Sequence, residues 1–135
     1  MHVQYATLCD QVILGNDGRP SLIGVFNDLQ VAGFPFTMPR IAFAARILFT
    51  ADEVGQNHKV EVVIRDPAGT ELGRPGGDLG LPPAPPGVDT VAVDIPLHFD
   101  LFEVTQAGRY TFLLHVDGAA TAGVQLAVRQ APTSA

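Results

Sequence analysis

The chain is short of basic side chains, and this shortage excludes two classes of partner. Lys59 is the only lysine among 135 residues, and with seven scattered arginines it faces fourteen acidic residues, which leaves a formal net charge of −6. A protein that grips a nucleic-acid backbone or an anionic membrane surface needs clustered Lys and Arg. We therefore expect neither nucleic acid nor a membrane among its partners.

Cysteine is almost absent as well, and tryptophan is missing altogether. Cys9 stands alone, so the chain forms no internal disulfide, and a lone thiol is compatible with a reducing compartment. The first ten residues lack the basic and apolar regions of a signal peptide. No apolar run approaches the roughly 18–20 residues that cross a bilayer. These features predict a cytoplasmic protein.

The motifs of common active sites are also lacking. None of the four histidines has another at the spacing of a zinc pair, and neither GxSxG nor a Walker-type glycine loop occurs. Asp94, His98 and Asp100 share one face of a predicted strand, where they bind a cation weakly or are simply solvated. Acidic residues in loops suggest the calcium-binding loops at the tips of some β-sandwiches, but ordinary solvated turns are favoured. These are Asp52, Glu53, Asp78 and Asp89. We expect no enzyme, no cofactor and no metal site.

What the chain does have is apolar residues that alternate with polar ones, as in strands with one buried face. In the segment 88–102 every second residue from Val91 to Leu101 is apolar. The same pattern covers 41–49, 60–64, 110–116 and 124–128, and the segments 3–14 and 21–31 are apolar on both sides. Turn signals separate these runs, and no stretch has the stripe and caps of a helix.

Many short strands between such turns predict an all-β protein. We predict a single antiparallel β-sandwich of immunoglobulin-like architecture with about seven to nine strands. One domain is expected over 1–130, with a frayed tail at 131–135. The charged motif RDPAG (65–69) is expected to be a hairpin turn, because Asp66 accepts from the turn backbone while Pro67 and Gly69 suit its second and fourth positions.

Two segments fit no strand pattern and hold the candidate partner-binding residues. In 73–87, ten of fifteen residues are Gly or Pro. We expect a stiff crossover between the sheets, with docking on an aromatic groove as the alternative. The prolines of this docking alternative are Pro82, Pro83, Pro85 and Pro86, within the stretch PPAPP. The stretch 31–41, broken by prolines, is expected to be a connection. Its side chains Phe34, Phe36 and Met38 plug the core, which is favoured, or form a rim for a partner or second subunit.

Two resemblances add to this interpretation. The segment 100–118, with Gly-x-Tyr opening its second strand, resembles the corner of immunoglobulin-like sandwiches, which implies that the Tyr110 hydroxyl bonds back to the chain just upstream. The stretches YATLCDQV, GRPSLIGVFNDLQV, FPFTMPRIAFAARILF, HKVEVVIRDPAGTEL and AGRYTFLLHVDG together resemble a family of small bacterial proteins of unknown function. That resemblance implies a fold and no site residues.

The missing catalytic motifs and the strongly alternating strands favour a non-catalytic module. Such a module binds another protein, or itself, through a sheet edge or one of the two irregular segments. The alternative is a sandwich that binds a small sugar or lipid on exposed aromatic side chains. Tyr5 is the aromatic residue whose side of the sheet the sequence leaves open.

Overall fold

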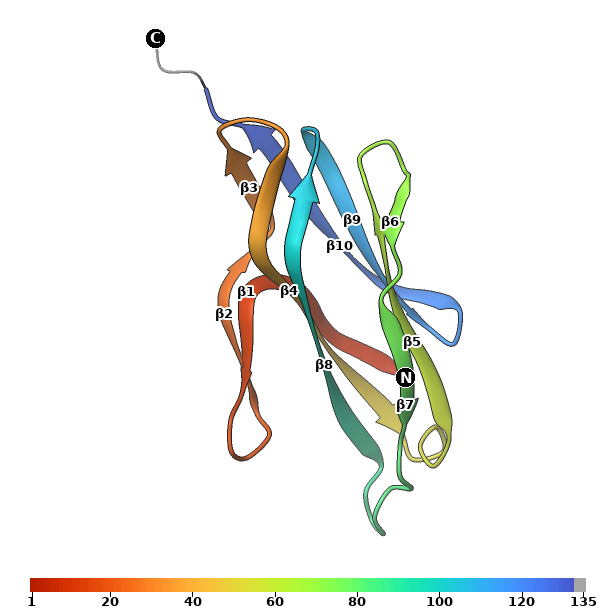
Figure 1. The fold of residues 1–135 in the computed structure, drawn as a ribbon. Helices are drawn as coiled ribbons and strands as arrows, with labels where there is room; N and C mark the ends of the chain where they lie inside the picture. The colour runs from red at the N-terminus through yellow and green to blue at the C-terminus, as the bar shows by residue number, and fades with distance from the viewer. Residues whose placement is uncertain (133–135) are drawn as a thin grey trace.

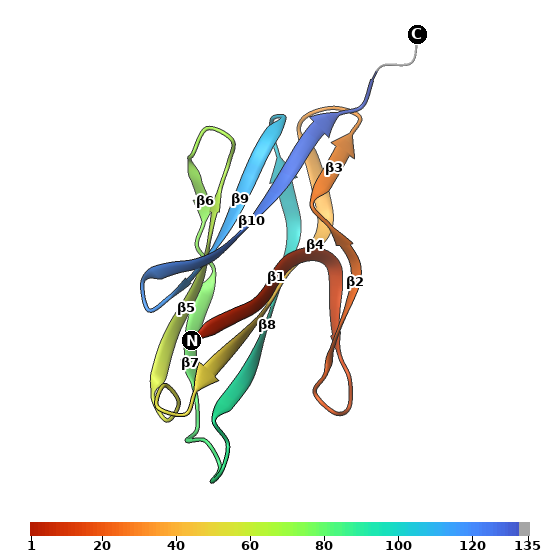
Figure 2. The same cartoon turned by 180° about the vertical axis from the view of Figure 1, so that it is seen from behind.

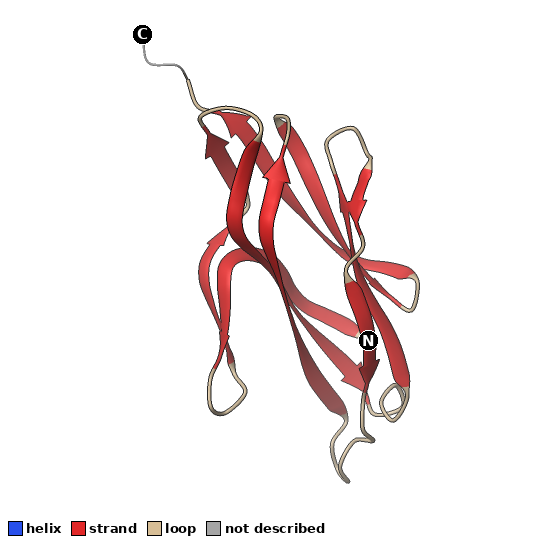
Figure 3. Cartoon of the chain, in the orientation of Figure 1, coloured by secondary structure: helices blue, strands red, loops and turns tan. Residues whose placement is uncertain are grey.

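The computed structural model describes residues 1–132, which form strands, turns and loops (Figures 1 and 3). In this part of the chain no helix is long and apolar enough to cross a membrane. The strands are β1 (His2–Leu14), β2 (Pro20–Phe26), β3 (Asp28–Val31), β4 (Phe36–Thr50), β5 (Asn57–Arg65), β6 (Glu71–Gly73), β7 (Gly76–Gly80), β8 (Thr90–Val104), β9 (Gly108–Val116) and β10 (Ala119–Gln130).

The strands form two sheets that pack face to face. The four-stranded sheet has the order β2-β1-β4-β8, and the six-stranded sheet has the order β3-β10-β9-β5-β6 with β7 also paired to β5. Side chains from both sheets join in one buried cluster that includes Phe43, Phe49, Tyr110 and Phe112. The predicted all-β sandwich is therefore confirmed, whereas its immunoglobulin-like arrangement stays a prediction.

The strand count and one strand direction differ from the prediction. There are ten strands in residues 1–132 and not seven to nine, because the segment 21–31 divides at Asn27 and two short strands form within 71–80. The chain passes from β2 in one sheet to β3 in the other at this break, since β3 joins β10. The β3–β10 pair is parallel, so the sandwich is not wholly antiparallel.

The side chains that the alternation predicts to face the core do so along most strands, but the prediction is wrong at the end of β8. Leu101 was expected to face the core, yet it is 72% exposed and has a φ of 56°. Both paired strands place two successive side chains outside at this level, Pro39 and Arg40 in β4 and Asp100 and Leu101 in β8. In both strands the side chains that face the core switch from one alternating set to the other at this bend. Because the two strands switch together, the pairing register of β4 and β8 is the same on either side of it.

Both irregular segments contain more strand than expected. The predicted connection at 31–41 is wrong, because β4 already begins at Phe36 and only 32–35 lie between strands. In the Gly/Pro-rich segment, which fits no strand pattern in the sequence, β7 pairs with β5. Gly76 makes this possible, since a Cβ there would overlap the carbonyl group of Val60. Residues 81–89 then cross from the six-stranded to the four-stranded sheet.

Two local predictions are confirmed. In the β5–β6 hairpin the Gly69 N–H donates to the Asp66 carbonyl oxygen (2.9 Å), and the Asp66 side chain accepts from the backbone of Ala68 and Thr70. The buried Tyr110 hydroxyl accepts from the Thr105 and Gln106 N–H groups and donates to the Gln106 carbonyl oxygen, all within 3.3 Å.

The structure describes only the first two residues of the predicted C-terminal tail at 131–135. The Ala131 N–H donates to the Val31 carbonyl oxygen (2.7 Å), so the first residue of the predicted tail is held beside β3. Residues 133–135 of that tail lie outside the described residues. The division into one domain over 1–130 stays a prediction.

Candidate interaction site

An apolar groove runs between the open edges of the two sheets, where β8 ends one sheet and β6 ends the other. Its volume is about 480 Å³. Phe99 and Phe102 form its floor on the β8 side and pack on Phe112, with ring centroids 6.4 and 5.7 Å apart. Ile64, Leu72 and Pro75 line the opposite wall. The groove therefore opens directly onto the aromatic part of the core, and we call it the β6–β8 groove.

Leu101 stands on the rim of this groove in a conformation that leucine rarely adopts. Its left-handed backbone places Phe99 and Phe102 on the same, core-facing side of β8. That geometry suits Gly or Asn, whereas for a larger L-residue it costs roughly 1–2 kcal/mol. Because the Leu101 side chain is mostly exposed, burial within the chain does not offset this cost.

The charges of the groove are acidic. Asp100 and Glu103 are among its lining residues, which include neither Lys nor Arg. Arg74 follows the β6 wall, but its guanidinium is paired with Glu71 (2.7 Å) and lies 3.9 Å from Glu61. The groove thus combines an apolar floor with carboxylates on the β8 side.

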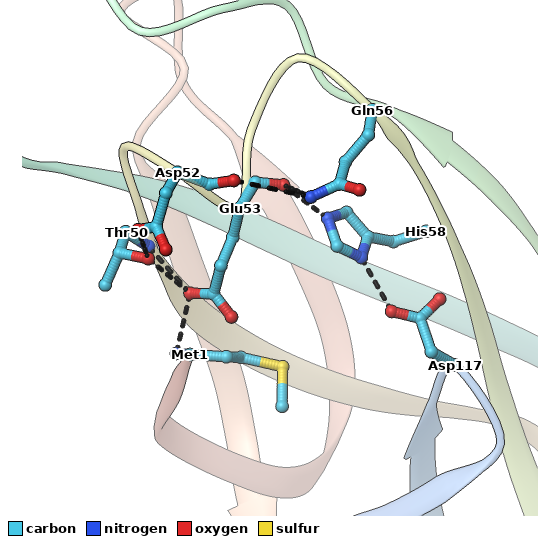
Figure 4. Close-up of polar contacts among 7 residues, drawn as sticks. All are labelled: Met1, Thr50, Asp52, Glu53, Gln56, His58 and Asp117. Carbon is cyan, nitrogen blue, oxygen red and sulfur yellow. Dashed lines mark hydrogen bonds and ion pairs between the residues drawn. The ribbon is translucent and has the colours of Figure 1, made fainter.

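A second cluster brings titratable groups together at the opposite end of β5 (Figure 4). His58 is buried, and its Nδ1 lies 2.7 Å from Asp117 Oδ2 while its Nε2 lies 2.6 Å from the Glu53 carbonyl oxygen. Both partners only accept hydrogen bonds, so both ring nitrogens donate and the imidazole carries two protons. The hydrogen bond to Asp117, followed by that to Glu53, raises the pKa of His58.

The carboxylates of this cluster are held ionised. Hydrogen bonding from the Met1 amine (2.7 Å) and then from Thr50 lowers the pKa of Glu53 to about 2. The hydrogen bond from His58, and then that from the Lys59 N–H, lowers the pKa of Asp117. Each of the residues drawn in Figure 4 makes a hydrogen bond or ion pair with another of them, and the two contacts of His58 fasten the β4–β5 loop to the β9–β10 turn.

Two residues of the predicted cation row on the four-stranded sheet, Asp94 and His98, contact other protein groups, and the third, Asp100, lines the β6–β8 groove. Asp94 pairs with Arg46 (3.2 Å), and His98 Nε2 accepts from the Val12 N–H (3.3 Å). Tyr5, whose side the sequence left open, packs on the outer cluster around Cys9. Burial is the main cause that raises the pKa of both Tyr5 and Cys9.

The calcium candidates are scattered over separate elements. Asp52 and Glu53 accept from Thr50, Asp78 stands in β7 opposite Lys59, and the carbonyl oxygen of Asp89 accepts from the Ala51 N–H. Within residues 1–132 no group of three or more His, Cys, Asp or Glu side chains is arranged to hold a metal ion.

The predicted partner-binding residues fall into two groups. Met38 is buried, and Phe34 and Phe36 are partly buried against the main core, which is the geometry of the favoured core role. Partner binding at these three residues stays a prediction. The prolines of the crossover are exposed, and their docking role likewise stays a prediction; they are Pro82, Pro83, Pro85 and Pro86.

Neither the β6–β8 groove nor the His58 cluster is predicted by the sequence pattern. The one available signal for the groove was DLFE (100–103), where two large apolar residues are adjacent and the alternation cannot continue on one face. Nothing in the spacing of His58 and Asp117, 59 residues apart, pointed to their contact.

Comparisons with known proteins give a family and nothing more specific. No curated protein matches the chain. A family model, described as a family of unknown function, matches residues 4–129 and so spans both sheets. The predicted resemblance to a family of unknown function is confirmed, and the bacterial origin stays a prediction. The chain belongs to the family of unknown function DUF6941.

Proposed function

We propose that this protein is a non-catalytic module that binds a protein segment in the β6–β8 groove. The observation that carries the proposal is Leu101, a large apolar side chain that is exposed on the groove rim in a strained backbone conformation. Strained residues of this kind concentrate at functional sites, where the strained conformation is part of how the site works. Contact with a partner would bury this leucine.

The groove also indicates the chemistry of its occupant. Its floor of Phe99 and Phe102 suits a large apolar side chain, and burial of such a side chain contributes roughly 1.5–3 kcal/mol. Asp100 and Glu103 favour a Lys or Arg next to that apolar anchor. The occupant that fits both features is a segment with one large apolar residue flanked by a basic one.

A non-catalytic role is supported by the state of the titratable groups. His58, Glu53 and Asp117 hold one another in place, and Asp94 is held by Arg46, so these groups act as structural contacts. The proposal also includes a cytoplasmic location, which the free and buried thiol of Cys9 supports.

The test is selection from a random peptide library against the wild-type protein, followed by binding measurements on Leu101→Asn. Asn has a shape similar to Leu and tolerates the left-handed conformation, so this variant is expected to fold with unchanged or slightly higher stability. Enriched peptides should carry an apolar residue beside Lys or Arg, and they should lose at least tenfold in affinity for Leu101→Asn, about 1.4 kcal/mol.

The matched control is Leu14→Asn, because Leu14 is an exposed leucine outside the groove. This variant should bind the selected peptides as the wild-type protein does. Failure to enrich any peptide, or equal loss of affinity in both variants, contradicts the proposal.

A small apolar ligand is the second candidate, and the groove volume favours it, since pockets for such ligands measure roughly 300–1,000 Å³. A panel of fatty acids and sugars in a thermal-shift assay separates the two candidates. A ligand that binds the folded state raises the unfolding midpoint by mass action. If a ligand raises the unfolding midpoint of the wild type but not that of Leu101→Asn, the occupant of the groove is a small molecule and not a protein segment.

A further inference from the structure

The gap between the open edges of the two sheets continues beyond the β6–β8 groove. A second hollow, with a volume of about 240 Å³, lies between β7 and β8. Its apolar side chains are Val60 and Leu79 on one wall and Ile95 and Leu97 on the other. We call it the β7–β8 hollow.

The hollow and the groove adjoin each other along the same two walls. On one wall Pro75 lines the groove and the next residue, Gly76, lines the hollow. On the other wall Phe99 lines the groove, and Leu97, two residues before it in β8, lines the hollow. In both Figure 1 and Figure 2 the end of β8 is level with β6 and its earlier part is level with β7. One extended segment that lies along β8 can therefore reach both.

The hollow lies where β7 lacks a side chain. Gly77 is paired with Val60, and directly opposed residues of an antiparallel pair face the same side of the sheet. Because Val60 is buried in the main core, a side chain at Gly77 would also face inward. A Cβ built on Gly77 meets nothing within 4 Å, although this residue lines the hollow. An apolar side chain supplied by a partner fits the space that Gly77 leaves.

The hollow is apolar, whereas the groove is acidic. Asp78 is the one charged residue that lines the hollow, and it lies opposite Lys59 in the β5–β7 pair. Both are exposed and adjoin the inward-facing pair of Val60 and Gly77, so their side chains lie on the outer face of the sheet. A Lys or Arg of the bound segment is therefore favoured in the groove, at Asp100 and Glu103, and not at the hollow.

The edge of β8 also offers backbone groups to an extended segment. Within residues 1–132 β8 is the last strand of its sheet and pairs with β4 alone, so its outer edge has no strand partner. Pro96 removes one N–H but leaves the other groups of the edge. Extended peptides bind such edges through main-chain hydrogen bonds while alternate side chains enter pockets.

The distance between the two cavities sets the spacing of the apolar residues that would fill them. The hollow lies at Ile95 and Leu97, and the floor of the groove is formed by Phe99 and Phe102. The two positions are about 15 Å apart along β8, at roughly 3.3 Å per residue. Because side chains of an extended segment point the same way at every second position, the nearest spacing is about four residues.

We propose that the segment bound in the β6–β8 groove lies extended along β8 and places a second apolar residue, four positions from the first, in the β7–β8 hollow. Its basic residue is next to the apolar residue in the groove only. This inference rests on the proposed function, because it identifies a second contact of the same bound segment.

The test uses the full chain, peptides selected from the random library against the wild type, and the variant Gly77→Leu, which fills the hollow from within. Gly77 has no left-handed φ and has space for a side chain, so the variant is expected to fold with an unchanged or higher unfolding midpoint. The matched control is Gly33→Leu. Gly33 lies outside both cavities, and a Cβ there also meets nothing within 4 Å.

Enriched peptides should carry two apolar residues four positions apart, with Lys or Arg beside only one of them. Gly77→Leu should bind them at least tenfold more weakly than the wild type and Gly33→Leu do. Replacement by Ala of the apolar peptide residue that has no basic neighbour should weaken binding to the wild type at least tenfold. The same replacement should leave binding to Gly77→Leu nearly unchanged, because the hollow of that variant is already filled.

Wild-type affinity in a folded Gly77→Leu variant overturns the second contact, and so do enriched peptides that carry a single apolar residue. If Leu101→Asn still weakens the binding of those peptides tenfold, the proposed function stands without the second contact. If the library yields no binding peptide, the proposed function and the second contact are both wrong.

Discussion

The buried His58 ring leads to a test in which little more than one charge is changed. In Asp117→Asn one carboxylate oxygen becomes an amide, and the left-handed backbone at this position (φ 52°) is one that Asn also adopts readily. The remaining oxygen can accept from His58 or from the Lys59 N–H, but the carboxylate accepts from both. A hydrogen bond to a charged group contributes about 1.5–3 kcal/mol, and the exposure of Asp117 favours the low end. We expect the variant to lose about 1.5 kcal/mol of unfolding free energy between pH 3.8 and 6.5.

The loss depends on pH in a direction that the pKa shifts determine. Hydrogen bonding to Asp117 and then to Glu53 raises the pKa of His58 above its ordinary 6.5, so the folded protein holds this proton more tightly than the unfolded chain. The stabilisation is therefore complete below pH 6.5 and is lost as the pH rises through the folded-state pKa. The pKa of Asp117 is lowered from 3.8 by its hydrogen bond with His58, so at the acid end the stabilisation is lost as the pH falls through that lowered pKa.

The assay is urea unfolding of wild type and variant at a series of pH values, with His2→Gln as the control because His2 is an exposed histidine outside the cluster. The difference between wild type and Asp117→Asn should be largest between pH 3.8 and 6.5 and should shrink as the pH rises further. His2→Gln should follow the wild-type profile. A constant difference at all pH values, or an NMR titration that gives His58 a pKa at or below 6.5, would refute the assignment of a doubly protonated ring.

Three further substitutions test the core and the short strand β7. Tyr110→Phe removes the hydroxyl that bonds three backbone groups and should cost about 1–2 kcal/mol in thermal unfolding; an unchanged midpoint would show that water replaces it. Phe112→Ala empties the centre of the core, removes the ring on which Phe99 and Phe102 pack, and should cost about 3–5 kcal/mol in urea unfolding; a loss below 1 kcal/mol would mean that the site collapses around the gap. Gly76→Ala meets the Val60 carbonyl and should speed amide exchange in β7, whereas Gly77→Ala, where an added Cβ meets nothing within 4 Å, should not; equal exchange in both contradicts the close approach.

Local patterns in the sequence were sufficient for the fold class and for several contacts. The alternation in 41–49 and 110–116 identified the buried faces of β4 and β9, because a strand with one face in the core needs an apolar residue at every second position. The RDPAG turn followed from the backbone preferences of Pro and Gly, and the corner resemblance placed the Tyr110 hydroxyl correctly.

The candidate groove was not predictable in the same way. Leu101 belongs to the apolar set of its strand by spacing, and only the coupled bend of β4 and β8 turns it outward. The β6–β8 groove exists because β8 and β6, in different sheets, both end their sheets on the same side of the core. The short strand β7 was missed because glycine weakens a strand in general, while here its small size permits a close approach to β5.

The sequence by itself determined that this chain is all-β, which faces of its regularly alternating strands are buried along most of their length, and where the RDPAG hairpin turns. Those properties arise from neighbours along the chain, through period-two burial and the φ preferences of Gly, Pro and Asp. The tertiary structure alone decided which strands are edges, where Leu101 points, and that His58 meets Asp117. These depend on contacts between residues far apart in the chain, and a local pattern carries no information about which distant strand will become its neighbour.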